Sequence, residues 1–504
     1  MNEPVAAVVV FGYLAVAVVL GLVAGRRGGG GVTDFVAGDR AFGPVLMYFV
    51  MGATIFSAYA LLGTPQRVVA KGSDMFFIFA FGSVGFVPLF FMGAKIRRIG
   101  ARSGYVTQAE FVGARFESGW VTGLMGIASV ASFVPYLVIQ MKGAGIVLEA
   151  VTGWSRLAGA ACVYAVVVVY VILGGVRGVG WTNVLQGIVM LVVVWTVGLA
   201  VPAAYFGGVG GLFDEIVTHH PSHLTLPGPQ AQTSDFRYTS EVLLSVLGFS
   251  MWPHVFMKCF TARSARLVQL SVALYPTFLL FLLPLVFLGY TAVAMGGPSD
   301  DTVLLWIARL PDHHPSPGSV VQWLGDNGIL MAGIAFAILA ASMSTGDALL
   351  HGAASIFVRD VWVQAFGRSM DDRAQTTAIR VLVLLFAYLG WQLFALAGSL
   401  PVVELLLLSY AIPVQFLPLV LAGLYWRGAT RRGAELGLTC GLLCALALFV
   451  LQHADPAFYA LVNPAGFEIG FLSVAVNAVV LVCVSLWTTR SSASHLANFE
   501  LGTS

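Results

Sequence analysis

The sequence predicts an all-α integral membrane protein, and two features of its composition and one of residue placement lead to that prediction. Apolar residues make up 58% of the 504 residues, and charged residues only 10%. The mean hydropathy is +0.88. A soluble domain carries about a quarter charged residues, so this chain has too few charges to cover a surface in water. Its charges lie in short stretches between apolar segments, and about 20 apolar residues suffice to cross a bilayer as a helix.

Apolar segments of this length follow one another along the whole chain. Several contain glycine or proline, which membrane helices tolerate when neighbouring helices satisfy the backbone. The segments predicted to span the membrane are, in chain order, 5–25, 44–70, 75–98, 120–149, 157–175, 181–206, 241–260, 267–295, 328–357, 376–398, 401–425, 434–452 and 467–488. The prediction is therefore about 13 transmembrane helices.

Lysine and arginine are distributed unevenly between the predicted loops. Twenty of the 26 lie in alternate loops that begin with the one after the first span, five lie in the other loops, and Lys142 lies inside a span. Because cytoplasmic loops carry the excess of these residues, we expect a multi-pass protein of the cell (plasma) membrane with its N-terminus outside and its C-terminus in the cytoplasm. The two long loops, 207–240 and 296–327, are then extracellular.

Other classes of protein lack support in the sequence. The first apolar segment, 5–25, is longer than the core of a signal peptide and no cleavage site follows Arg27, so no cleavable signal is expected. The five cysteines lack zinc-ligand spacing. No basic patch suggests nucleic acid as a partner, and no obligate protein partner is evident. Paired carboxylates, nucleophile motifs and metal motifs are not found inside a span, so we do not expect an enzyme.

The second span carries residues that can break a helix. Gly52, Thr54 and Ser57 lie within six residues, and Gly63 and Pro65 follow. An unwound segment at this depth would expose carbonyl oxygens, which transporters use to bind sodium. The alternative is close helix packing through small residues.

The ninth span carries three hydroxyl side chains within four residues, Ser342, Ser344 and Thr345, followed by Asp347. Sodium is a hard cation that neutral oxygen ligands suit. A single buried hydroxyl more often bonds to a carbonyl one turn earlier in its own helix. The cluster together with a broken second span favours a cation site between the two.

Four stretches resemble the sodium:solute symporter family, the carriers of sugars, proline, pantothenate and monocarboxylates. The match covers most of the chain, and the combination is specific although each stretch alone is not. The stretches are Asp34 to Gly38, Gly174 to Arg177 continuing through Trp181 to Gly187, Ala340 to Asp347 continuing to Arg359-Asp360, and Gly423 to Trp426.

The resemblance implies a five-plus-five inverted-repeat transporter core with its solute at the midplane. It divides the chain into an accessory first span and loop (1–43), a first repeat (44–206), an extracellular loop (207–240), a second repeat (241–425), and two accessory spans with a short tail (426–504). It also implies a sodium ion as the coupling ion, with no organic cofactor. By position, the family's sodium ligands fall on the carbonyls of Ala53, Phe56 and Ala341 and the hydroxyls of Ser344 and Thr345.

Two positions depart from the family pattern. Ile55 stands where proline carriers have an aspartate, which makes a proline-type site less expected. Asn183 stands where many members have an aspartate near the inner end of the sixth span. This second departure leaves open a different coupling stoichiometry, or coupling to protons.

The solute is the least determined part of the prediction. Lys142 lies within the fourth span, where it either offsets the carboxylate of an anionic solute or makes a structural pair. The stretches 104–111 and 134–140 are most similar to the monocarboxylate branch. The residues predicted to contact the solute are Ser57, Tyr59, Gln66, Gln140, Lys142, Trp252 and Gln415, with His254 and Tyr410 as further cavity candidates.

The sequence thus predicts a secondary active transporter that carries a small solute together with sodium across the lipid bilayer. The preferred solute is a monocarboxylate such as pyruvate, lactate or acetate. The alternatives are an amino acid, pantothenate or a sugar. An alternative of another class is a membrane-embedded solute sensor.

Overall fold

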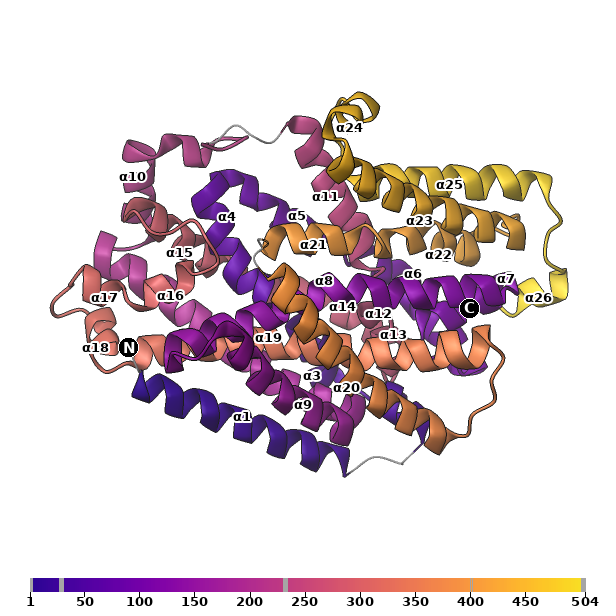
Figure 1. Ribbon diagram of the computed structural model, residues 1–504, viewed down its shortest axis with the longest axis horizontal. Helices are drawn as coiled ribbons and strands as arrows, with labels where there is room; N and C mark the ends of the chain where they lie inside the picture. The colour runs from indigo at the N-terminus through magenta and orange to yellow at the C-terminus, as the bar shows by residue number, and fades with distance from the viewer. Residues whose placement is uncertain (1–2, 27–30, 230–233, 399, 401, 500–504) are drawn as a thin grey trace.

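The computed structural model describes residues 3–26, 31–229, 234–398, 400 and 402–499. Most of this part is helical and it contains no strand, apart from one isolated bridge between Phe42 and Ala262. Most long helices run roughly along the longest axis of the molecule (Figure 1). The prediction of an all-α membrane protein is confirmed.

Five predicted spans are single helices. They are α1 (Pro4–Gly25), α8 (Gly119–Thr152), α20 (Asp372–Ala397), α23 (Arg431–Ala454) and α25 (Ile469–Trp487).

Six other spans are built from consecutive helices with a bend, a break or a change of helix type between them. They are α3 (Pro44–Ala53) with η2 (Tyr59–Gly63) and α4 (Thr64–Lys71), α5 (Phe77–Val84) with α6 (Val87–Ser103), and α11 (Asp235–Phe249) with α12 (Pro253–Phe256) and α13 (Lys258–Thr261). The others are α14 (Ala265–Leu279) with α15 (Leu282–Ala294), α19 (Ile329–Ile356) with η5 (Phe357–Ala365), and α21 (Val402–Tyr410) with η6 (Pro413–Gln415) and α22 (Phe416–Tyr425).

The fifth and sixth predicted spans share the element α9 (Arg156–Phe206), which reverses direction at Gly175. Gly175 has a φ of 52°, which favours glycine. Tyr170 and Thr182, on the two sides of this residue, both bond to Asp347. They would stand about 18 Å apart along a straight helix, so the chain must fold back between them.

By length and hydropathy alone, nine helices of the described residues can cross a membrane, or ten if the bent pair α11 with α12–α13 is one span. The number is lower than 13 for three reasons. Helix α9 contains two predicted spans, and the region Tyr59–Ser103 is counted once although it covers parts of two predicted spans. The helices of two further spans are too short to be counted. The breaks therefore account for the difference.

Shorter helices connect the spans. Four of them lie near one end of the molecule: α10 (Val209–His219), α16 (Val303–Ala308), α17 (Leu310–His313) and α18 (Val320–Asp326) (Figure 1). The two long loops therefore share a side, as predicted. Two others, α7 (Gln108–Phe116) and α26 (Ala493–Ala497), lie at the opposite end (Figure 1). The remaining connectors are α2 (Val32–Ala37), η1 (Gly38–Arg40), η3 (Gly72–Phe76), η4 (Pro221–Leu224) and α24 (Pro456–Val462).

The helix α19 is the central element of the fold. In its most apolar window 83% of the residues are buried, against 28% for α20 and α23 and 33% for α1 and α25. Helices with low burial have faces free for lipid, whereas α19 is enclosed by protein. Polar side chains on α19 therefore face other helices.

Candidate functional site

The second span is interrupted in the middle of the fold. Helix α3 ends at Ala53, and π-helical η2 begins at Tyr59. Between them, the amide of Ala58 donates to the side-chain oxygen Oε1 of Gln140 on α8, at 2.9 Å. A side chain from another helix thus satisfies a backbone group that the interruption leaves without a helical partner.

Two hydroxyls of α19 bind the carbonyl oxygens at this interruption. Ser344 Oγ donates to the carbonyl of Ala53 at 2.8 Å and lies 3.1 Å from the carbonyl of Ala341. Thr345 Oγ1 donates to the carbonyl of Thr54 at 2.8 Å. All of these residues are buried, and both hydroxyls are fully enclosed. Several neutral oxygens therefore converge in a space shielded from solvent, which is the type of environment that a sodium ion requires.

Four of the five predicted sodium residues lie in this oxygen cluster: Ala53, Ala341, Ser344 and Thr345. The fifth, Phe56, lies at the same interruption. Its amide bonds to the carbonyl of Gly52, and its ring lines a neighbouring pocket. Thr54 belongs to the cluster but was not predicted, because a carbonyl group is present at every residue and the sequence does not mark which one is freed.

Further buried polar groups lie next to the oxygen cluster. Asn183 Nδ2 donates to Thr54 Oγ1 at 3.1 Å. Asp347 Oδ2 accepts from Tyr170 at 2.8 Å and from Thr182 at 3.4 Å. Its other oxygen, Oδ1, is buried and has no hydrogen-bond partner among the described residues. The carboxylate of Asp347 on α19 thus contacts the sixth span at Thr182. The next residue is Asn183, at the position where the resemblance leads one to expect an aspartate.

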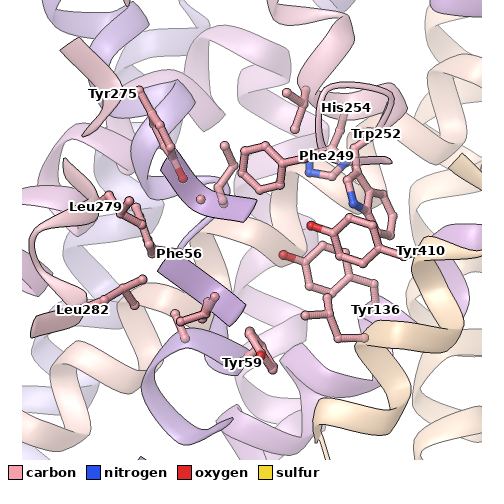
Figure 2. Close-up of a pocket in the computed structure, with 16 residues that line it drawn as sticks. Phe56, Tyr59, Tyr136, Phe249, Trp252, His254, Tyr275, Leu279, Leu282 and Tyr410 are labelled. Atoms are coloured by element: carbon pink, nitrogen blue, oxygen red, sulfur yellow. The ribbon is translucent and has the colours of Figure 1, made fainter. Parts of the chain in front are cut away.

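A pocket lies beside the interruption (Figure 2). Its empty volume is about 460 Å³, including its open side. The lining residues come from the second, third, fourth, seventh, eighth and eleventh spans. They are Ile55, Phe56, Tyr59, Ala60, Ile78, Gly82, Tyr136, Phe249, Trp252, His254, Val255, Tyr275, Leu279, Leu282, Leu406 and Tyr410.

The lining is aromatic, and its two sides differ. Tyr136, Trp252, His254 and Tyr410 gather on one side, whereas Phe56, Leu279 and Leu282 lie on the other side with Tyr275 (Figure 2). The rings of Tyr136 and Trp252 are 5.0 Å apart, and those of Trp252 and Tyr410 are 5.3 Å apart. All lining side chains are uncharged types or histidine.

Two polar atoms of the lining are unsatisfied. His254 Nδ1 and the hydroxyl of Tyr275 are buried, and neither has a hydrogen-bond partner within the described part of the chain. Leaving such groups unpaired costs about 1–3 kcal/mol each. Both are therefore available to a polar group that enters the pocket.

Tyr136 connects the pocket to the oxygen cluster. Its ring lines the pocket, and its hydroxyl lies near the side chains of Ser57 and Thr345. Thr345 in turn bonds to the carbonyl of Thr54. One side chain therefore contacts both the pocket and a member of the cluster.

Two of the seven predicted solute residues line the pocket, namely Tyr59 and Trp252, and so do the further candidates His254 and Tyr410. Two others support the interruption. Ser57 Oγ accepts from the amide of Tyr59 at 3.2 Å, and the side chain of Gln140 binds the amide of Ala58.

The remaining three predicted residues make contacts outside the pocket lining. Gln66 Nε2 donates to the carbonyl of Ser299 at 3.2 Å. Lys142 pairs with Asp301, as the structural interpretation of this lysine expected, with 2.5 Å between Nζ and Oδ2. Gln415 binds Ser473 and Asn477 on the accessory helix α25.

Sequence reasoning did not single out several lining residues, among them Tyr136, Phe249 and Tyr275. Aromatic residues are common in all the spans, and nothing in their spacing separates a pocket wall from ordinary packing. Tyr136 was within a stretch already noted for its similarity to monocarboxylate carriers, and its place six residues before Lys142 was the available signal.

The comparison with protein families gives one match, to the model described as "Sodium:solute symporter family", over residues 35–441. Two relatives in Bacillus subtilis (strain 168) are themselves described as uncharacterized symporters. YhjB is 26% identical over 97% of this chain and 98% of its own length. YodF is 25% identical over 95% of this chain and 92% of its own length.

A solved structure has a similar fold. It is a Na+-coupled sialic acid symporter in a substrate-bound, outward-open state, with a TM-score of 0.75. The alignment covers 97% of this chain and 98% of that one at 16% sequence identity. At this identity the likeness concerns the fold alone.

Proposed function

The chain belongs to the sodium:solute symporter family, and from that premise we propose that it carries a small organic acid into the cell together with sodium. The protein is a multi-pass membrane transporter, not an enzyme. The preferred solute is a monocarboxylate of the size of pyruvate, lactate or acetate. The proposed ligands of the coupling ion are Ala53, Phe56, Ala341, Ser344 and Thr345, with the carbonyl of Thr54 as an addition.

The oxygen cluster supports the choice of sodium. Its members are hydroxyls and carbonyls, and the nearby carboxylate of Asp347 bonds to Tyr170 and Thr182. A site of neutral oxygens binds a monovalent cation weakly enough to release it to the cytoplasm. The two sides of the site come from α3 and α19, so an ion bound between them would stabilise one arrangement of these helices.

The observation that carries the proposal is the position of Tyr136. Its hydroxyl approaches Thr345 of the ion site, while its ring forms a wall of the pocket. An ion that engages Thr345 changes the hydrogen bonding available to Tyr136, and through it the shape of the pocket. Coupling between two ligands requires such a shared element.

The pocket supports a small solute with one apolar and one polar end. Phe56, Leu279 and Leu282 provide apolar surface, and Tyr136, Trp252 and Tyr410 carry groups that can donate hydrogen bonds to a carboxylate. A sugar would require a partner for each hydroxyl, and the lining has no carboxylate or amide side chain to provide one. The pairing of Lys142 with Asp301 means that recognition in this proposal rests on neutral donors.

The proposal is tested by uptake into proteoliposomes that contain the purified full chain. Radiolabelled pyruvate, lactate, acetate, proline, pantothenate and glucose are compared under an inward sodium gradient and under an equal potassium gradient. We expect accumulation of one or more of the monocarboxylates in sodium only. An inward proton gradient without sodium serves as the second comparison.

Each outcome separates the alternatives. Sodium-dependent uptake of proline, pantothenate or glucose alone would retain the symporter and reject the organic acid. Uptake that follows the proton gradient would reject sodium. Saturable solute binding without any uptake would favour the sensor. The orientation with the N-terminus outside the plasma membrane is tested separately by protease protection of tags at the two ends.

A further inference from the structure

An ion pair joins the fourth span to the loop between α15 and α16. Lys142 Nζ on α8 lies 2.5 Å from Asp301 Oδ2, and it also donates to the carbonyl of Leu400 at 2.8 Å. Both residues are buried, at 5% and 8% relative exposure. A buried ion pair requires compensation for the desolvation of both charges, so the loop is held in a defined position.

The two adjacent aspartates of this loop have different roles. Asp300 Oδ1 accepts from the amide and hydroxyl of Thr302, which fixes the local turn. Asp301 points to Lys142, and its second oxygen, Oδ1, is buried without a hydrogen-bond partner in the part of the chain that the structure describes. The turn therefore presents one carboxylate inward.

The same loop is bound at two further points. Gln66 on α4 donates to the carbonyl of Ser299 at 3.2 Å. At the end of α16, Arg309 donates to the carbonyl of Ala150 on α8 at 3.2 Å. The segment 299–309 thus contacts the second span on one side and the fourth span on the other.

These contacts lie on the same elements that line the pocket, six or seven residues further along each of them. Lys142 follows the lining residue Tyr136 by six residues on α8, about 9 Å along the helix. Gln66 follows the lining residue Tyr59 by seven residues. Leu400 precedes the lining residue Leu406 by six residues. The turn 299–302 therefore lies beyond the pocket, toward the end of these spans that the lysine and arginine distribution predicts to be extracellular.

We infer that Lys142 and Asp301 are gating residues of the transport reaction: their ion pair closes the turn 299–302 over the outer mouth of the pocket, and solute enters after it separates. The inference rests on the proposed transport function, but its test does not require transport to be measured. Lys142 acts on the turn and does not contact the solute. Separation exposes both charges to water, which offsets the loss of their mutual attraction.

The test measures access to the pocket from outside. In a chain whose five native cysteines are replaced, Leu406→Cys introduces a thiol in the pocket wall. Its modification by a membrane-impermeant thiol reagent added to the outside of intact cells is timed, without added solute. We expect Lys142→Met and Asp301→Asn each to accelerate modification by roughly tenfold, a factor that corresponds to about 1.4 kcal/mol in the closing equilibrium.

Two further variants separate gating from general loosening. The charge-swapped pair Lys142→Asp with Asp301→Lys should return the rate to within about threefold of the parent, because the attraction is restored. Glu149 lies on α8, the helix that carries Lys142, and forms an exposed ion pair with Arg156 of α9; Glu149→Gln breaks this pair and should leave the rate unchanged.

Modification at the parent rate in both single variants would overturn the inference, and so would acceleration that the swapped pair does not reverse. Because the measurement is made without added solute and does not depend on uptake, failure of the organic-acid assignment leaves its result intact. Conversely, uptake of a monocarboxylate with unchanged thiol access would retain the proposed function and reject the gate.

Discussion

The hydroxyl of Ser344 lies 2.8 Å from the carbonyl oxygen of Ala53, although the two residues are 291 positions apart in the chain. This contact joins the end of α3 to the middle of α19, and the neighbouring contact from Thr345 to the carbonyl of Thr54 runs parallel to it. The two hydroxyls thus hold the interrupted second span against the most enclosed helix. An ion at this point would replace hydrogen bonds that already connect the two spans.

Replacement of Thr345 by alanine should weaken sodium dependence. A hydroxyl ligand to a charged group contributes about 1.5–3 kcal/mol, so we expect Thr345→Ala to raise the sodium concentration for half-maximal uptake by tens-fold. Thr345→Ser, which keeps the hydroxyl, should stay within a few-fold of the parent. The measurement is the initial uptake rate in proteoliposomes over a series of sodium concentrations.

Ser355→Ala is the matched control for this prediction. Ser355 is buried on the same helix, and its hydroxyl has no hydrogen-bond partner among the described residues. Its removal should leave the sodium dependence unaltered. Equal sodium dependence in Thr345→Ala and the parent would remove Thr345 from the ion site.

Gln140 should be required for the interruption of the second span. Its Oε1 satisfies the amide of Ala58, and its own carbonyl accepts from Ser342 at 2.6 Å. Gln140→Leu leaves the amide of Ala58 buried and unpaired, at a cost of about 1–3 kcal/mol. We expect a lower melting temperature and weaker sodium binding together, the latter measured as sodium-dependent protection of the protein against heat.

The control for Gln140 is a second glutamine whose side chain bonds to the backbone of another helix. Gln269 binds the carbonyl of Phe90 at an exposed site on α6, where the helix itself still bonds that carbonyl. Gln269→Leu should alter neither quantity. A Gln140→Leu protein with the parent's sodium protection would show that the interruption does not depend on this side chain.

Gly346 should tolerate no side chain. A methyl group added there would overlap the hydroxyl of Tyr164, which is buried at 3% exposure. Because Gly346 follows Thr345 directly, the adjustment would displace a proposed ion ligand. We expect Gly346→Ala to lose about 1–3 kcal/mol of stability through overpacking and to reduce uptake at limiting sodium.

The same helix provides both a control and a rescue for this prediction. At Gly333 the nearest atom to an added methyl is 3.6 Å away on Val193, so Gly333→Ala should be neutral. Tyr164→Phe removes the overlapping hydroxyl and should restore part of the loss in the double variant. A double variant no better than Gly346→Ala would assign the loss to another cause.

The sequence predicted the membrane class and the placement of spans because both follow from local hydropathy. It also singled out Ser344 and Thr345, two members of the oxygen cluster, since hydroxyl side chains are unusual inside an apolar helix. The family resemblance supplied the matching carbonyls of Ala53 and Ala341. Thr54 was missed because backbone oxygens carry no sequence signal.

The lining of the pocket was harder to predict because polar side chains in spans have several uses. Gln66, Lys142 and Gln415 resemble binding residues in sequence, yet each contacts another part of the protein. Lys142 meets Asp301 across 159 positions, a pairing that no local pattern encodes. Half of the residues that line the pocket are aromatic, counting His254, and the spacing of such residues is the same in a wall and in a core.

Arg67 should be the most sensitive charged residue on the predicted extracellular side. Its guanidinium pairs with Asp74 and, at 2.6 Å, with Glu241, and it lies 4.2 Å from the centre of the Phe77 ring. All three charged side chains are nearly inaccessible, at 3%, 0% and 1% exposure. Arg67→Met leaves two buried carboxylates without this partner, for which we expect a loss of about 3–5 kcal/mol. The measurement is the melting temperature of the purified protein in detergent.

Arg156→Met provides the comparison, because Arg156 and Glu149 form an ion pair with 46% and 44% of their side chains exposed. Exposed pairs contribute about 0–1 kcal/mol, so this variant should melt close to the parent. Replacing the carboxylates together with Arg67, as in Arg67→Met with Asp74→Asn and Glu241→Gln, should recover part of the lost stability. If Arg67→Met and Arg156→Met had the same melting temperature, the burial of the Arg67 cluster would not determine how much it contributes to stability. The second, third and seventh spans would then be held together by apolar packing alone.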